Sequence, residues 1–383
     1  FNEKEALLLV ATLKERMFEV EKEVQKVFQP KWVDVKLVTP KLKKDGKLSK
    51  SGLTDYEYAE IKNITGDMKP FMRQKLQEFN LGSRKQIGEY LTDFGWKPNR
   101  FTPTGQPIVD ESSLAKVKKI PEAKLIAEFL LLQKRIAQID SWITAVADDS
   151  RVHGFVIPNG TITGRMSHRK PNMAQVPSAS SEYGKECRAC WIVKDGYKLL
   201  GVDASGLELR MLAHYMDNKE YTNEVTEGDI HTTNQKLAGL KSRDKAKTFI
   251  YALCYGAGDQ KLSTILGGNT KDARRIREHF LDNLPSFKRL KNRVGKAAKR
   301  GYLKGLDGRK IFIRNDYAAL NSLLQGGGAI VMKRALAMLH SLIKLQSLDA
   351  KFVANIHDEW QLEVKEDITD FVGQLAVGCI EKA

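Results

Sequence analysis

Two short stretches of the sequence place carboxylates where they could act on a phosphate. The apolar run Leu199–Val202 ends on Asp203, and the small residues Ala-Ser-Gly separate this aspartate from a helical pattern that begins with Glu208. A strand that ends on a carboxylate and turns into a helix presents that carboxylate at an exposed rim, where a metal ion and a polyanionic substrate can reach it. The alternative is an ordinary strand-to-helix turn in which Asp203 caps the helix.

A second carboxylate pair lies at the tip of a predicted hairpin. Its strands, Phe352–Ile356 and Trp360–Val364, look buried, and His357–Glu359 forms the turn between them. Charged residues at a turn are normally just solvated, but here two core strands hold the tip. If these strands neighbour the one that ends at Asp203, then Asp203 and Asp358 can share two Mg²⁺ ions about 3.5–4 Å apart, the geometry for in-line phosphoryl displacement.

A third stretch combines cations with aromatics. Four residues recur at every fourth position and therefore lie along one helical stripe: Arg243, Lys247, Tyr251 and Tyr255. This combination suits a nucleotide, because Arg and Lys neutralise a triphosphate while a tyrosine stacks on a base or sugar. Gly256 would let the backbone approach a template closely. His231 could donate a hydrogen bond to a phosphate, although a lone histidine is more often structural.

Mostly helical segments surround these three stretches. Helices are predicted over residues 1–28, from Ser83 (the first residue of a capping-box pattern), from Pro121, over 207–300 and from about Tyr317 to Leu345. Hairpins are predicted over Trp32–Leu53, turning at Lys44–Lys47, and over Trp191–Asp203, turning at Lys194–Gly196, with a further turn at Gly305–Gly308. Seven lysines fall between Lys31 and Lys50. They form either a solvated basic hairpin or an electrostatic contact to nucleic acid.

The composition bounds the partners. A charge of +16 on a chain of 383 residues, 42% of them hydrophobic, indicates two or three domains and a polyanionic partner, most often nucleic acid. The four cysteines include one C-x-x-C pair without a second, so we expect reduced thiols in a cytosolic protein. No apolar run approaches the ~20 residues of a membrane span, and no signal peptide is apparent. Because the chain begins at Phe1, we expect it to be part of a longer protein.

In this order and at these separations, the motifs resemble those of the family A DNA polymerases. The matching segments are Asp203–Arg210, Arg243–Gly256, His357–Glu359, Thr163–Arg165, Pro171–Asn172 and Asn321–Gln325. The resemblance covers roughly Ser83 to Val364 and is closest to the replicative polymerases of short-tailed bacteriophages. It implies an α+β right-hand fold with an antiparallel palm sheet and mostly helical fingers and thumb. The implied parts are a thumb over 1–148 with a basic insertion at about 31–75, a palm over 149–212 and 316–383, and fingers over 213–315.

The resemblance also implies roles for single residues. Asp203 and Asp358, with the backbone carbonyl of Val202 or Ala204, would hold two Mg²⁺ ions, for which Mn²⁺ can substitute, and Glu359 would support them without being an obligatory ligand. The deoxynucleotide would be bound by Arg243, Lys247, His231, Tyr251 and Glu208. Lys247 would protonate the departing pyrophosphate, and Glu208 would occupy the space that a ribose 2′-hydroxyl needs. Template and primer would be bound by Tyr255, Gly256, Arg165, Gln325, His357, Asn321, Ser83 and Arg84.

The implied function is template-directed DNA synthesis, by nucleotidyl transfer from a dNTP to a primer 3′-hydroxyl with release of pyrophosphate. A phage-type single-subunit RNA polymerase is one alternative, and Glu208 argues against it because ribonucleotides need that space. A non-catalytic nucleic-acid-binding protein is another; Asp203 and Asp358 argue against it, since acids without metals repel DNA. A two-metal nuclease would not need the Arg243–Tyr255 helix.

We expect primer–template DNA and dNTPs as partners, a monomer, no membrane association, and the cytoplasm (of an infected host cell if the protein is viral). A processivity factor bound to the thumb insertion competes with direct duplex binding by the lysines as the role of that segment. Asp55–Glu57 has the D-x-E look of an exonuclease motif but stands in the basic insertion, so we interpret it as surface.

Overall fold

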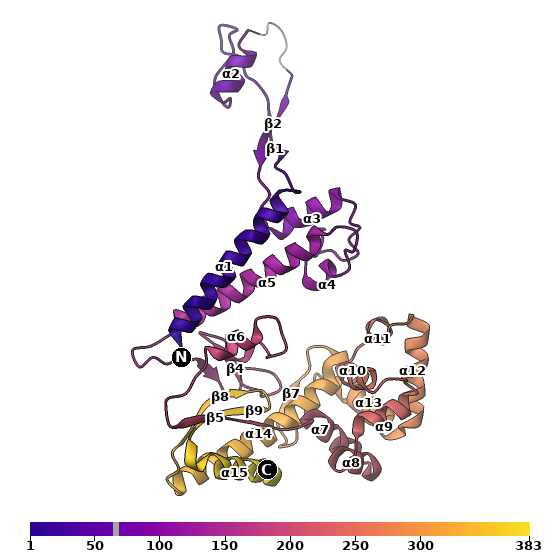
Figure 1. Ribbon diagram of the computed structural model, residues 1–383. Coiled ribbons are helices and arrows are strands. Elements are labelled where there is room, and N and C mark those ends of the chain that lie inside the picture. The colour runs from indigo at the N-terminus through magenta and orange to yellow at the C-terminus, as the bar shows by residue number, and fades with distance from the viewer. Residues whose placement is uncertain (64–68) are drawn as a thin grey trace. The chain divides into compact units, whose positions relative to one another are not determined.

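The computed structural model describes residues 1–63 and 69–383, which form two compact units. One unit is Lys4–Ile143, and the other combines Phe1–Glu3 with Thr144–Ala383 (Figure 1). Residues 64–68 of the predicted basic insertion lie outside the described residues. The finer division into thumb, palm and fingers stays a prediction.

The Lys4–Ile143 unit is built on two long antiparallel helices that lie side by side (Figure 1). They are α1 (Glu3–Gln25) and α5 (Glu122–Ile143), accompanied by the shorter α3 (Arg84–Asp93) and α4 (Glu111–Leu114). Their apolar stripes supply buried side chains such as Leu13 and Ile126, because residues three and four apart share a face. Arg16 on α1 donates from Nε to Glu128 on α5 at 2.7 Å, which fixes the two helices together at the edge of this core.

The basic insertion is a two-stranded ribbon rather than the predicted local hairpin. Strand β1 (Lys31–Val38) pairs antiparallel with β2 (Phe71–Gln77), and α2 (Asp55–Ile61) lies between them in the chain. The predicted hairpin over Trp32–Leu53 is therefore wrong, since the partner of its first strand comes later in the sequence. Its turn does exist, because Leu42 and Leu48 form an isolated antiparallel bridge.

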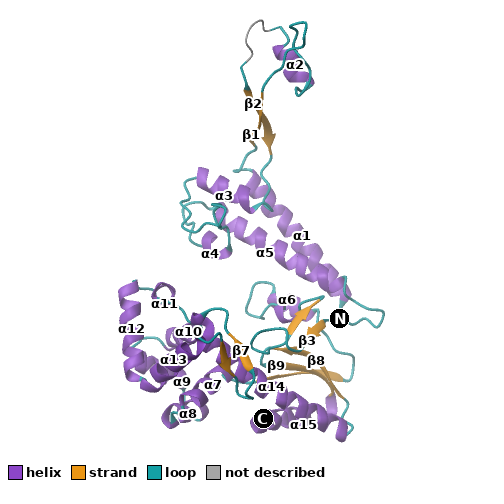
Figure 2. Ribbon diagram, turned by 180° about the vertical axis from the view of Figure 1, so that it is seen from behind, coloured by secondary structure: helices purple, strands orange, loops and turns teal. Residues whose placement is uncertain are grey.

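The other unit contains a three-stranded antiparallel sheet, in the order β5-β9-β8, at one side of its helices (Figure 2). Its strands are β5 (Tyr197–Asp203), β8 (Ala350–Ile356) and β9 (Glu359–Lys365), and two helices pack against it: α14 (Ala319–Leu345) and α15 (Thr369–Lys382). Every second side chain of β9 points to the same face of the sheet. On this face, Trp360, Leu362 and Val364 are fully buried against these helices. The predicted hairpin near the C-terminus is confirmed.

The predicted Trp191–Asp203 hairpin is wrong. Residues 191–196 contain no strand, although Tyr197 donates from its amide to the Lys194 carbonyl, as a turn requires. Strand β5 instead takes β9 as its partner, from Tyr197 opposite Lys365 to Asp203 opposite Glu359. Short elements precede it: β3 (Phe155–Ile157), β4 (Ser167–Arg169), η1 (Met173–Gln175) and α6 (Gly184–Ala189).

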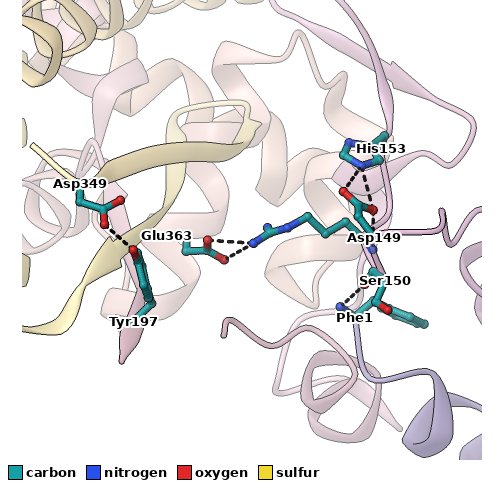
Figure 3. A network of polar contacts seen from close by, with 8 residues as sticks. Phe1, Asp149, Ser150, His153, Tyr197, Asp349 and Glu363 are labelled. Carbon is teal, nitrogen blue, oxygen red and sulfur yellow. Dashed lines mark hydrogen bonds and ion pairs between the residues drawn. The ribbon is translucent and has the colours of Figure 1, made fainter. Parts of the chain in front are cut away.

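Polar contacts tie the segment that enters this unit to the sheet (Figure 3). Glu363 of β9 is only 2% exposed and accepts two hydrogen bonds from Arg151 Nη2, at 2.9 and 3.0 Å. The hydroxyl of Tyr197 donates to Asp349, which joins the start of β5 to the residue before β8. The ion pair of Arg151 with Glu363 fixes the entering segment, because the buried carboxylate of Glu363 would be costly without its partner, although the Arg151 side chain is itself 42% exposed.

Residues 207–300 are mostly helical, as predicted. The helices are α7 (Leu207–Met216), α8 (Lys219–Thr226), α9 (Ile230–Ala238), α10 (Arg243–Cys254), α11 (Asp259–Leu266), α12 (Thr270–Asn283) and α13 (Pro285–Ala298). Phe249, Phe280 and Phe287 are fully buried and meet edge-on in their common core. The predicted turn at Gly305–Gly308 joins β6 (Tyr302–Lys304) to β7 (Lys310–Phe312), and short helices η2 (Asp316–Ala318) and η3 (Glu366–Ile368) complete the chain.

Two further features concern the environment of the chain. Over the described residues, none of the helices has both the length and the apolar character needed to cross a membrane. The four cysteines, Cys187, Cys190, Cys254 and Cys379, are buried.

Candidate active site

The pairing of β5 with β9 brings Asp203 and Asp358 to one edge of the sheet. Asp203 is the last residue of β5 and lies opposite Glu359, the first residue of β9. Beyond them, the amide of Ala204 donates to the carbonyl oxygen of Asp358 at 3.1 Å. The condition stated for a shared metal site, that these strands are neighbours, is met. The alternative of Asp203 as a helix cap is wrong, because Gly206, at φ 61°, is the N-cap of α7.

Three carboxylates share this edge, and their charges repel. The pKa of Asp203 is raised, first by partial burial and then by the neighbouring charges of Glu359 and Asp358. The carboxylate of Glu359 accepts a hydrogen bond from the side-chain amide of Gln361, which fixes its orientation. A divalent cation would relieve the repulsion among the three groups.

The donor set fits Mg²⁺. Within residues 1–63 and 69–383, no three His, Cys, Asp or Glu side chains are grouped as a complete metal site. An ion at Asp203 and Asp358 would therefore complete its shell with a backbone carbonyl, water or substrate oxygens, as Mg²⁺ commonly does. Of the two predicted carbonyl ligands, Ala204 accepts a hydrogen bond from the Leu207 amide at 3.3 Å and keeps a second lone pair, while Val202 lies in register with Trp360.

Arg165 bridges the carboxylates of Asp358 and Glu208. Its Nη2 donates to both carboxylate oxygens of Asp358, at 2.9 and 3.1 Å, and to Glu208 at 3.2 Å. Only 15% of its side chain is exposed, and its buried Nε has no partner among the described residues. A metal ion bound by Asp358 would compete with this guanidinium for the same oxygens.

Glu208 links helix α10 to the edge of the sheet that carries Asp203 and Asp358. It lies in the first turn of α7, is 8% exposed, and accepts a hydrogen bond from the Tyr255 hydroxyl at 2.7 Å. Burial and this carboxylate raise the pKa of Tyr255, so the phenol stays protonated and keeps donating. The ring of Tyr251 lies 6.4 Å from that of Tyr255, and burial raises its pKa as well.

The first cation of the predicted stripe on α10 is Arg243, one helical turn before Lys247. Arg243 donates to both oxygens of Asp229, at 2.7 and 2.9 Å, and this pairing holds the pKa of Asp229 well below its usual range. Lys247 is exposed. Burial, with the nearby charges of Lys247 and Arg243, lowers the pKa of His231, whose ring is therefore neutral at pH 7. Its buried Nδ1 has no partner in the described part of the chain.

Gly256 has a structural requirement that the sequence did not reveal. Its φ is +76°, and a Cβ built there would lie 2.0 Å from the carbonyl oxygen of Tyr317 in η2. The observed close approach is thus to another part of this chain, and any side chain at this position would force the two segments apart.

Three of the other residues predicted to contact template and primer lie on α14 and at the tip of the β8–β9 hairpin. Asn321 and Gln325 lie one turn apart on α14, and the buried Oδ1 of Asn321 has no partner among the described residues. His357 occupies the hairpin tip at φ 58°.

Ser83 and Arg84 lie in the Lys4–Ile143 unit. Ser83 caps α3 by accepting from the Gln86 amide, and Arg84 donates to the Val109 carbonyl. The reciprocal half of the predicted capping box is absent here, because Gln86 accepts from Asn80 instead.

Sequence reasoning missed two residues of the site. Asp229, the partner of Arg243, could have been found, because an acid two residues before His231 fits the N-cap of a helix, where its oxygen in fact accepts from the His231 amide. Tyr317 offered no signal, since nothing local in the sequence connects it with Gly256.

The chain is similar to known DNA polymerases in sequence and in fold. Residues 56–383 match the family model for DNA polymerase family A. The chain is 39% identical over 340 residues to the DNA-directed DNA polymerase of Enterobacteria phage T3, an alignment that covers 78% of this chain and 48% of that protein. The chain is 38% identical over 346 residues to the DNA-directed DNA polymerase of Escherichia phage T7, an alignment that covers 80% of this chain and 49% of that protein. The chain therefore spans about half the length of these relatives.

A third relative is covered more fully. The DNA-directed DNA polymerase of Escherichia phage Phieco32 is 40% identical over 427 residues, with 84% of this chain and 68% of that protein aligned.

Among solved structures, the chain is similar to the POL domain of Pol1 from M. smegmatis, described in complex with DNA primer-template and dNTP. The TM-score is 0.80 at 21% sequence identity, over 99% of this chain and 63% of that one. This likeness confirms the predicted α+β polymerase fold, with an antiparallel sheet and mostly helical surroundings. The chain belongs to DNA polymerase family A.

Proposed function

We propose that the chain carries out template-directed DNA synthesis, transferring a nucleotidyl group from a dNTP to a primer 3′-hydroxyl and releasing pyrophosphate. One observation carries this proposal: the β5–β9 pairing sets Asp203 and Asp358 at the same edge of the sheet, with the buried Glu208 bonded into that edge through Arg165. The names of the T3, T7 and Phieco32 relatives support it.

Asp203, Asp358 and the carbonyl of Val202 or Ala204 would hold two Mg²⁺ ions, for which Mn²⁺ can substitute; when bound, these ions activate the primer hydroxyl and neutralise charge on the triphosphate. Glu359 lies opposite Asp203, and its bond from Gln361 holds it in place. We assign it a supporting role: it keeps the edge negative, and so favours cations there, without itself being a required ligand.

The exposed start of α10 suits the triphosphate. Asp229 holds the Arg243 guanidinium in a bidentate pair, which orients it for a phosphate. Lys247, one turn on, would donate its proton to the departing pyrophosphate. His231 is neutral and can still donate one ring N–H to a phosphate oxygen. Tyr251 would lie against the sugar.

Glu208 would discriminate against ribonucleotides. Its carboxylate is buried and held by Arg165 and Tyr255, so it cannot swing away without breaking both bonds. A ribose 2′-hydroxyl pressed against it would lose its hydrogen bonds to water, at a cost of about 1–3 kcal/mol. This contact favours a DNA polymerase over the single-subunit RNA polymerases.

The template and primer contacts are proposed on the same basis. Tyr255 and Gly256 would meet the template base. Donors at Arg165, Gln325, Asn321 and His357 can reach purine N3 and pyrimidine O2, acceptors that every correct pair presents in the minor groove. Ser83 and Arg84, at the N-terminus of α3, would contact the DNA backbone. We further propose that the enzyme acts as a monomer in the cytoplasm, in an infected host cell if it is viral.

Primer–template extension tests the proposal directly. The protein is given Mg²⁺ and either deoxy- or ribonucleotides, with Asp203→Ala as the inactive variant. Asp195→Asn, a carboxylate exposed at the other end of β5, serves as the matched control. Addition of deoxynucleotides by the wild type and by Asp195→Asn, but not by Asp203→Ala, is expected. A folded sample that adds no nucleotide would overturn the proposal.

A further inference from the structure

Lys333 lies in the middle of α14, and its ammonium group is bonded to a loop that is distant in the sequence. Its Nζ donates to the carbonyl oxygen of Pro158 at 2.7 Å and to Oδ1 of Asn159 at 2.5 Å. Both acceptors belong to residues 158–166, the loop between β3 and β4. Lys344, an exposed lysine in the last turn of the same helix, makes no such bond in the described part of the chain.

The surroundings of Lys333 favour these two bonds. Its side chain is partly buried, and this burial, together with the nearby charge of Arg309, lowers the pKa of the ammonium. A cation that loses water on burial costs free energy unless hydrogen-bond acceptors replace that water. The loop supplies two such acceptors, so the ammonium and the loop hold each other in place.

The loop that Lys333 holds is the one that carries Arg165. Antiparallel pairing of β3 with β4 brings the two ends of the loop together. Inside the loop, the hydroxyl of Thr161 donates to the carbonyl oxygen of Arg165 at 3.2 Å, and the amide of Gly164 donates to the carbonyl oxygen of Thr161 at 3.0 Å. The loop is therefore braced internally, and a shift at residues 158–159 would be passed on to Arg165.

Arg165 depends on the position of its backbone because one atom makes all its contacts with the site. Its Nη2 donates to both carboxylate oxygens of Asp358 and to Glu208, at distances between 2.9 and 3.2 Å. Hydrogen bonds of this type occupy a range of about 2.7–3.2 Å and weaken steeply when their angle is lost. A backbone displacement of about 1 Å would therefore break one or more of them.

We propose that Lys333 is a positioning residue for nucleotidyl transfer: it holds residues 158–159 against α14 and thereby keeps the guanidinium of Arg165 on Asp358 and Glu208. The inference rests on the proposed function, which assigns these carboxylates to metal binding and to selection of the sugar. Among the described residues, no hydrogen bond joins Lys333 to either carboxylate, so it acts through Arg165. Without the ammonium, the guanidinium leaves Asp358 more often, and a metal ion meets less competition there.

Binding of Mn²⁺ alone tests this coupling, with electron paramagnetic resonance of the free ion as the readout. The samples are the wild type, Lys333→Met, Arg165→Ala and the double variant, with Asp203→Ala to define binding elsewhere on the chain. Arg165→Ala is expected to tighten binding about fivefold and Lys333→Met about twofold, because loss of the anchor loosens the guanidinium without removing it. The double variant should bind as Arg165→Ala does, since the two residues act as one unit.

The double variant also separates positioning from simple charge. If the charge of Lys333 repelled the metal ion from a distance, its removal would tighten binding by the same factor with or without Arg165, and the proposal would be wrong. It is equally wrong if Arg165→Ala leaves Mn²⁺ binding unchanged, because Lys333 would then have nothing to act through. Lys344→Met removes the same charge from the same helix and should bind as the wild type does.

Hydrogen exchange shows whether the loop itself responds. Mass spectrometry of peptides from residues 158–166 should report faster amide exchange in Lys333→Met than in the wild type or Lys344→Met. Asn159→Ala keeps the charge and removes one acceptor, so it should change exchange and Mn²⁺ binding in the same direction by a smaller factor. This variant also decides the matter if thermal melts show Lys333→Met to be unfolded. A loop that loosens while Mn²⁺ binding stays constant would reduce Lys333 to a structural role and overturn the inference.

Neither measurement uses DNA, a nucleotide or turnover, so the two proposals can fail separately. Coupling between Lys333 and Arg165 in a protein that adds no nucleotide would overturn the synthetic activity and leave the positioning role intact. Independent effects of the two substitutions in a protein that extends primers would overturn the positioning role alone.

Discussion

The two halves of the candidate site are built in different ways. The carboxylates of Asp203 and Asp358 are fixed by backbone pairing between β5 and β9, so their positions follow from strand register. The cations, Arg243 and Lys247, extend from one face of a helix, and within residues 1–63 and 69–383 only the first of the two is held by a partner, Asp229. The first half is rigid and tolerates no change of length. The second reaches its substrate through long side chains, so its binding of the triphosphate should tolerate a change that keeps the charge.

The largest effect that this contrast predicts is the loss of a strand-borne carboxylate. Asp203→Asn keeps the shape but removes the charge needed for metal binding, and metal ions contribute several kcal/mol of charge stabilisation in the transition state. We expect kcat for primer extension to fall by about 10³-fold or more. A reduction smaller than tenfold, with Asp195→Asn as control, would show that Asp203 does not hold the metal.

The helix-borne half should be less sensitive. Lys247→Ala is expected to lower kcat by roughly 10²-fold, because general acid catalysis contributes about 10²–10⁴-fold. Lys247→Arg should recover much of the binding of triphosphate, seen in KM, but little of kcat, since a guanidinium is a poor proton donor. Single-turnover rates measure both, and Lys236→Ala, an exposed lysine of α9, is the control. Equal kcat for the Ala and Arg variants and the wild type would remove Lys247 from the chemistry.

Glu208 connects the two halves, and its loss should change selectivity more than rate. In Glu208→Ala, the preference for deoxy- over ribonucleotides in kcat/KM is expected to fall by roughly 10- to 100-fold. Tyr255→Phe leaves the carboxylate in place but removes one of its hydrogen bonds, so it should lose less discrimination. If the two variants discriminate as the wild type does, Glu208 does not contact the sugar.

A smaller effect concerns Arg165 as competitor of the metal. Arg165→Ala removes the guanidinium from Asp358, so Mn²⁺ should bind about fivefold more tightly, the order of one partly exposed ion pair. Electron paramagnetic resonance of free Mn²⁺ reads this without any turnover, and Arg169→Ala, an exposed neighbour on β4, is the control. Weaker Mn²⁺ binding in Arg165→Ala would mean that the arginine supports the metal site instead.

The smallest effect is on stability. The pKa of Asp203 is higher in the folded chain than in the unfolded chain, so the ionised carboxylate penalises folding. This penalty is absent below the unfolded pKa, grows as pH rises from the unfolded to the folded pKa, and is complete above the folded pKa. In EDTA, the Tm of Asp203→Asn should therefore exceed that of the wild type at pH 7.5, and the difference should shrink toward pH 4. A difference that grows toward low pH would contradict the assigned repulsion.

Much of the carboxylate half could be predicted from the sequence, and the reason is local. The apolar run before Asp203 and the alternation around Asp358 each specify a strand and its end, and only the pairing of the two strands had to be assumed. The four-residue recurrence on α10 likewise specified one stripe. Such periodicities indicate whether a segment is a helix or a strand, because side chains on one face recur every few residues.

Partners distant in the chain could not be predicted in the same way. The turn signals at Lys44–Lys47 and Lys194–Gly196 are real turns, yet β1 pairs with β2 and β5 with β9, because a turn signal does not say which strand is paired. The contacts of Arg165 with Asp358 and Glu208 also join residues far apart in sequence. They depend on packing that no local pattern encodes.

The close fit of Gly256 against Tyr317 has a mechanical consequence for α10. The C-terminal end of this helix is pressed against the backbone of η2, whereas its first turn, with Arg243, is exposed. Because the buried face of α10 also packs on α9 and α11, the helix can turn about Gly256 only together with these neighbours. The 12 residues of the helix make an arm of about 18 Å, so a rotation of about 10° at Gly256 would move Arg243 by about 3 Å while Tyr255 hardly leaves its place beside Glu208.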